Sequence, residues 1–134
     1  MKRTLISIGL ALTLSSAFAC DTSKYSTAPL QLNVQPKVQS TVTWDFSDCP
    51  FELIESMFRV NYSGGKHGLT VHAYDLTTGE EIPAVVDNGN GQANTSIGFR
   101  APGNITGHVI TLTFDLKGTT PKYVAVFQTP LIIR

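Results

Sequence analysis

The stretch from Leu30 to Phe46, LQLNVQPKVQSTVTWDF, decides the fold class. Its even-numbered positions are mostly apolar and the positions between them are polar, which is the period of a strand with one buried face. Pro36 interrupts the run, because proline has no N–H to donate to a neighbouring strand. We therefore predict two strands, at about 29–35 and at about 38–46.

The same alternation recurs along the rest of the chain. It predicts further strands at 57–62 and at 69–76, then a hairpin connection at 77–80 that leads to an alternating run over Ile82, Ala84 and Val86. More strands are predicted around Ile97 and Phe99, at 110–116, at 123–127 and at 131–133. Turns rich in glycine, proline and asparagine separate these runs, and no segment has ten residues of helical periodicity. Short strands at near-regular spacing predict an all-β fold, an antiparallel Ig-like β-sandwich.

The apolar phase of these strands identifies the expected core. Its members in two of the clearest runs are Val42, Trp44, Phe46, Leu112 and Phe114. Trp44 is the only tryptophan, and its phase predicts that it is buried rather than exposed for stacking on a ligand.

Length and charge exclude several classes of protein. The chain has 134 residues, too few for a multi-domain enzyme. Its 10 basic and 10 acidic residues leave no positive excess with which to neutralise nucleic-acid phosphates. A hydrophobic fraction of 42% also argues against intrinsic disorder.

The N-terminal residues have the pattern of a secretory signal peptide. Met1-Lys2-Arg3 is a positive start, Leu5–Leu14 is mostly apolar, and Ala17-Phe18-Ala19 ends the segment with small residues at the cleavage positions. We predict a signal peptide at 1–19, of the short bacterial kind, and a single sandwich domain at 20–134. The mature chain would carry 8 basic and 10 acidic residues.

Cys20, the first residue of the mature chain, has two interpretations. In the first it forms a disulfide with Cys49, the only other cysteine, since disulfides persist in exported proteins. In the second it carries a lipid, because bacterial lipoprotein signals end in a small residue before a cysteine, as Ala19 stands before Cys20. The protein would then be anchored in the cell envelope through Cys20, with Cys49 as a free thiol.

Residues that could perform chemistry are few and scattered. The sequence predicts no metal site, no cofactor and no enzyme, since the three histidines, His67, His72 and His108, lack the compact spacing of zinc ligands. Two acidic groups, Asp45 to Glu55 and Glu80-Glu81, are interpreted as solvated side chains at turns. The loop 87–92 lacks carboxylates at alternate positions and does not fit a calcium loop.

One further pattern resembles a known family. An early cysteine, a second cysteine after the strand Val42–Cys49 (VTWDFSDC), and a strand Gly68–Asp75 (GLTVHAYD) with a turn at Thr78-Gly79 resemble fimbrial subunits of the chaperone–usher class. The resemblance implies that the two cysteines are bridged and that the Ig-like sandwich is incomplete. It also implies a neighbouring subunit that fills the gap with a donated strand.

The family likeness implies a function and a set of partners. We expect a structural or adhesive subunit of a bacterial surface fimbria, with other fimbrial subunits, a periplasmic chaperone and an outer-membrane usher as partners, and with no nucleic acid. Leu30, Leu32 and Val34 have the alternation of a donor strand. We place the donor there because nothing of the mature chain precedes Cys20. The alternative function is an envelope lipoprotein with a β-sandwich binding module.

Overall fold

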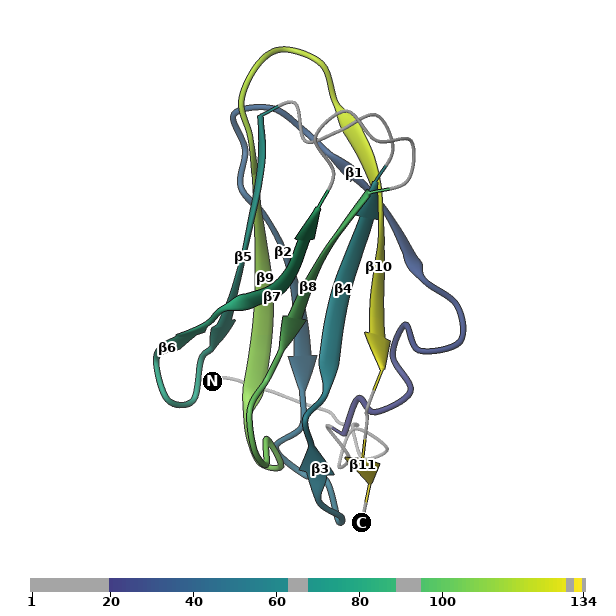
Figure 1. Ribbon diagram of the computed structural model, residues 1–134, viewed down its shortest axis with the longest axis vertical. Helices are drawn as coiled ribbons and strands as arrows, with labels where there is room; N and C mark the ends of the chain where they lie inside the picture. Colours follow the sequence, from purple (N-terminus) through teal and green to yellow (C-terminus); the bar gives the residue numbers. More distant parts are fainter. Residues whose placement is uncertain (1–19, 63–67, 89–94, 130–131, 134) are drawn as a thin grey trace, which may run out of the picture.

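Two antiparallel sheets pack face to face in the computed structural model, which describes residues 20–62, 68–88, 95–129 and 132–133. Residues 1–19, predicted as a signal peptide, the predicted turn at 63–66, His67 and most of the predicted loop 87–94 lie outside the described residues. Within them there is no helix, and hence none long and apolar enough to cross a membrane. The predicted β-sandwich is confirmed (Figure 1).

One sheet has five strands and lies at the front in Figure 1. In spatial order these are β1 (Leu30–Val34), β10 (Lys122–Thr129), β4 (Met57–Tyr62), β8 (Thr95–Arg100) and β7 (Ala84–Asn88). The other sheet has four strands, in the order β2 (Ser40–Asp45), β9 (Val109–Leu116), β5 (Leu69–Asp75) and β6 (Glu80–Ile82). A short pair, β3 (Leu53–Ile54) and β11 (Ile132–Ile133), lies at the bottom of the view.

The strands pair in a nested order, as in one long hairpin that has been rolled up. β1 pairs with β10, β2 with β9, β4 with β8 and β5 with β6. This nesting over two sheets is the topology of a jelly roll. It differs from the immunoglobulin order, in which the first two strands lie in the same sheet, because here β1 and β2 lie in opposite sheets.

The alternation predicted to run through Ile82, Ala84 and Val86 does not hold. Ile82 is buried, but Pro83 ends β6, and β7 continues in the other sheet, where it crosses to the side of β8 (Figure 1). A register shift between Ala84 and Val86 then leaves Val85 52% exposed. A proline cannot continue the ladder, so the strand changes sheets at this point.

Apolar side chains from both sheets meet in one core. The expected core residues lie in it: Trp44, Phe46, Leu112 and Phe114 are 0% exposed and Val42 is 5% exposed. Trp44, on β2, makes an edge contact with Phe58 of β4 in the other sheet, with ring centroids 4.8 Å apart. Phe58 also approaches Phe46, so aromatic rings span the space between the sheets.

The first described residues, Cys20–Ala28, form a leader that is fixed to both sheets. The disulfide between Cys20 and Cys49 holds its start. Asp21 pairs with Asp45 at the edge of β2, its N–H donating to the Asp45 carbonyl and its carboxylate accepting from the Asp45 N–H. At the other sheet, the Gln128 N–H donates to the Tyr25 carbonyl, beyond the end of the β1–β10 ladder. The leader therefore closes one side of the sandwich.

The leader also covers Trp44. The Lys24 carbonyl accepts a hydrogen bond from the Trp44 indole N–H at 3.3 Å, and the Lys24 ammonium donates to the Thr43 carbonyl. The Tyr25 ring stands edge-on to Trp44, with centroids 5.7 Å apart, and Tyr25 adopts φ = 64°. Because a tyrosine in this left-handed region is strained, the packing of its ring must compensate for the backbone.

Loss of the disulfide is expected to free the leader. The variant Cys20→Ala/Cys49→Ala should lower the free energy of unfolding by about 3–4 kcal/mol, the effect of closing a loop of this length. The fluorescence of Trp44, the only tryptophan, should move to longer wavelength, because its cover is lost. Urea titration followed by fluorescence measures both.

A control for this experiment is Thr41→Ala, an exposed position on the same strand as Trp44. It should leave the emission of the folded protein unchanged. If the double cysteine variant also keeps the native emission, the leader is held by its hydrogen bonds alone and the disulfide does not position it.

Candidate functional site

The predicted donor segment lies inside this chain's own sandwich. Leu30, Leu32 and Val34 form the inward face of β1 at the edge of the five-stranded sheet, opposite Val126, Val124 and Lys122 of β10. Val34 is fully buried, and Leu30 and Leu32 pack against the core. The position beside β10 is therefore filled by a strand of the same chain.

The bridge between Cys20 and Cys49 is present, as both the first interpretation of Cys20 and the family resemblance expected. A lipid thioether and a disulfide both require the Cys20 sulfur, so one sulfur cannot carry both. Cys49 packs against the core beside the leader.

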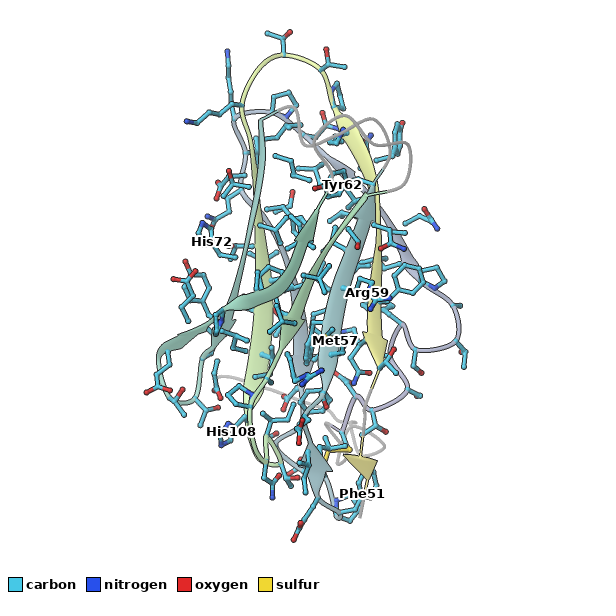
Figure 2. All side chains as sticks on the ribbon, viewed as in Figure 1. Phe51, Met57, Arg59, Tyr62, His72 and His108 are labelled. Carbon is cyan, nitrogen blue, oxygen red and sulfur yellow. A yellow bond between two sulfur atoms is a disulfide. The ribbon has the colours of Figure 1, made fainter. Side chains whose placement is uncertain are left out.

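Two of the histidines each pair with a carboxylate, which the sequence did not reveal. His108 Nδ1 lies 2.6 Å from Asp75 Oδ2, at the lower end of the sandwich (Figure 2). The Asp75 side chain is only 11% exposed and that of His108 27%. Asp75 ends β5 and His108 precedes β9, and because these strands are neighbours, residues 33 positions apart meet.

The Asp75–His108 pair has a structural role. The second oxygen of Asp75, Oδ1, accepts hydrogen bonds from the N–H groups of Thr77 and Thr78. It thereby holds the turn between β5 and β6, a type of turn that aspartate favours. The carboxylate thus fastens this turn to the segment before β9.

The second histidine pair is exposed. His72 Nδ1 lies 2.8 Å from Glu81 Oε2, and the two side chains are 40% and 55% exposed. The pair joins the outer faces of β5 and β6, and the His72 ring stacks beside Tyr74. Exposed pairs of this kind contribute about 0–1 kcal/mol.

The acidic residues between Asp45 and Glu55 do not converge on one site. Asp45 accepts from the Ser47 N–H, whereas Glu55 lies 3.8 Å from Arg100 on a different strand. Within the described part of the chain, no group of three or more His, Cys, Asp and Glu side chains could hold a metal ion. The loop 87–92, which the sequence predicts is not a calcium loop, lies almost wholly outside that part.

The outer face of the five-stranded sheet carries a hollow of about 290 Å³. It is lined by side chains of β4, β8 and β10, which are Met57, Arg59, Asn61, Arg100, Phe127 and Thr129. Met57 and Arg59 follow one another on the outer face of β4 in Figure 2. We call this feature the arginine hollow.

The sheet register explains how the arginine hollow forms. Phe127, Arg59 and Gly98 are consecutive cross-strand neighbours, and so are Thr129, Met57 and Arg100 in the next outward-facing row. Gly98 has no side chain, and the Met57 methyl group and Val86 occupy the space over it. The hollow thus lies over three hydrogen-bonded strands.

The two guanidinium groups of the hollow differ in their surroundings. Arg100 faces Glu55 at 3.8 Å, with both side chains about half exposed. The Arg59 guanidinium has no ion pair or hydrogen bond with any residue in the described ranges. None of the six lining residues is acidic. The hollow therefore presents uncompensated positive charge beside apolar surface.

Comparison of the chain with protein-family models, with curated proteins and with solved structures finds no match.

Sequence reasoning did not find the arginine hollow. Its residues come from three segments, at 57–61, at 100 and at 127–129, and none of them belongs to a motif. The available signal was Met57 and Arg59 in the outward phase of a predicted strand. Those two residues indicate a hollow only when it is known which strands lie on either side of β4.

Asp75 is expected to stabilise the fold much more than Glu81 does. Asp75→Ala removes the acceptor of two backbone N–H groups and of His108 at a nearly buried position, and should cost about 2–3 kcal/mol in the free energy of unfolding. Glu81→Ala, which breaks the exposed pair with His72, should cost less than about 1 kcal/mol. Equilibrium urea unfolding compares them, and equal costs would refute the structural role of Asp75.

Proposed function

We propose that the protein is a binding module of the bacterial cell surface, an adhesive subunit that works through the outer face of its five-stranded sheet. The observation that carries this proposal is the arginine hollow, where two cations and two large apolar side chains share an exposed face. Small-molecule sites commonly combine an apolar lining with a few convergent polar groups.

The disulfide supports export from the cytoplasm. Both cysteines are half-buried, Cys49 packs against the core, and the bridge holds the start of the leader, so the fold uses it. Bridges of this structural kind persist in oxidising compartments and are rare in the cytosol. This agrees with the secretory pattern predicted for residues 1–19.

The closed sandwich supports a self-contained module. β1 fills the edge beside β10, and the leader closes the side between β10 and β2. The outer face that carries the hollow thus belongs to a domain held together by its own chain. Binding through such a face requires no exchange of strands with a partner.

A charge placed on this face should abolish adhesion. Ala125 lies half-buried on the outer face of β10, opposite Asn61 of the hollow. Cells that produce the Ala125→Asp variant should display normal amounts of protein at the surface but adhere at least about tenfold less to host-cell or matrix surfaces. Surface immunolabelling and an adhesion count measure the two quantities.

The matched control is Thr113→Asp, which places the same charge at a half-buried, outward position of the other sheet. It should preserve both display and adhesion. If cells without the protein adhere as well as cells with it, or if the protein is absent from the surface, the proposed function is wrong.

A second candidate is the structural fimbrial subunit that the family resemblance implies. The observation in its favour is β1, an edge strand with alternating apolar residues, which among the described residues pairs with β10 alone. Such a strand could be donated to another copy, with a chaperone and an usher guiding assembly. The disulfide at Cys20 and the link to β2 both tether β1 to its own chain, which favours the self-contained module.

An engineered crosslink distinguishes the two candidates. Gln31 of β1 and Ala125 of β10 are opposite each other on the outer face, at a separation that a disulfide can span. In the variant Gln31→Cys/Ala125→Cys, a self-contained module forms a bridge within one chain and migrates as a monomer in non-reducing electrophoresis. Donated strands would give a covalent ladder, which Gln31→Cys alone would not.

A further inference from the structure

We infer that the arginine hollow binds the carboxylate-bearing ring of an acidic sugar. This deepens the proposed function, on which it rests, by naming the class of ligand. The site consists of Arg59 and Arg100, the apolar side chains of Phe127 and Met57, and the polar groups of Asn61 and Thr129. The two arginines match the carboxylate of such a ring, the apolar pair matches its C–H face, and the polar pair matches its hydroxyl groups.

The charge of the ligand follows from the two guanidinium groups. A guanidinium presents N–H donors in a planar fork that matches a carboxylate, so the pair can be bidentate. Arg59 has no partner among the described residues and no acidic side chain lines the hollow, so its donors are available. Arg100 lies 3.8 Å from Glu55, which is not among the residues that line the hollow.

The size of the hollow points to a single ring. About 290 Å³ is just below the range of about 300–1,000 Å³ that is typical of sites for drug-sized ligands. Phe127 and Met57 offer apolar surface on which the C–H face of a pyranose can be buried. Asn61 and Thr129, at opposite ends of the site along β4 and β10, can exchange hydrogen bonds with ring hydroxyls.

The strands beneath the arginine hollow argue against an acidic peptide as its ligand. Extended peptides gain much of their affinity by adding main-chain hydrogen bonds to an open strand edge. The floor of the hollow is formed by β10, β4 and β8, and β4 is paired on both sides, with β10 and with β8. Only side chains are therefore offered to a ligand, which suits the hydroxyl and carboxylate groups of a sugar acid.

The test compares two ligands that differ in one group, methyl β-D-glucuronoside and methyl β-D-glucoside. Titration of the purified full chain, followed by two-dimensional ¹⁵N–¹H spectra, should shift amides of β4, β8 and β10 around the hollow. The dissociation constant for the glucuronoside should be about millimolar, as expected for a single ring. It should be at least about tenfold lower than that for the glucoside, because the charged hydrogen bonds are lost with the carboxylate.

Variants assign the effect to the hollow. Arg59→Gln keeps a polar side chain at an exposed position and should weaken glucuronoside binding about tenfold, with no change in thermal stability. Lys117→Gln removes a charge from an exposed position on the β9–β10 connection and should leave binding unchanged.

Several results would overturn the inference. They are the absence of shifts around the hollow, equal affinity for the two glycosides, and an Arg59→Gln variant that binds as the parent does. If a blocked Glu-Glu dipeptide binds in an Arg59-dependent way and the glucuronoside does not, the site takes acidic peptides instead. In each case, a loss of adhesion in the Ala125→Asp variant would still support the proposed adhesive function. Only the proposed class of ligand would then be wrong.

Discussion

The packing of Trp44 is the constraint on which the rest of the structure depends. Its ring is fully buried between Phe58 of the opposite sheet and Tyr25 of the leader, with centroid distances of 4.8 Å and 5.7 Å. An indole in a core needs a partner for its N–H, and the Lys24 carbonyl supplies it. One side chain thus ties together β2, β4 and the leader.

The leader supplies partners for main-chain groups at the edges of the sandwich. A strand at an edge exposes unpaired N–H and C=O groups, and β2 is such a strand. Asp21 and Lys24 satisfy main-chain groups of Asp45 and Thr43 on this edge, and Tyr25 does the same for Gln128 on β10. The disulfide makes this cover permanent, because it keeps the start of the leader next to Cys49.

The sequence predicted what depends on local periodicity. The period of two that runs through Val42, Trp44 and Phe46 follows from burial of one face of a strand, so strand positions and core residues could be inferred. The nested strand order could not, because pairing β1 with β10 joins segments about ninety residues apart that have no complementary motif.

The same limit applies to side-chain sites. His108 meets Asp75, and Arg59 meets Phe127, only because of the register between distant strands. The alternation indicated that Arg59 points outward, but not what lies beside it. Where the alternation itself failed, after Ile82, Pro83 marked the break in the sequence, but a local pattern cannot reveal that the chain continues in the other sheet.

The core and the candidate site are linked through one strand. β4 places Phe58 inward against Trp44, and its neighbours Met57 and Arg59 outward in the arginine hollow, because successive residues of a strand face opposite sides. The aromatic contacts that fix Phe58 therefore also fix the backbone of the two residues beside it. A rigid backbone lowers the entropy lost when a ligand orders the side chains above it. A sandwich whose core is locked by Trp44 thus presents Arg59 from a position that is set before any ligand arrives.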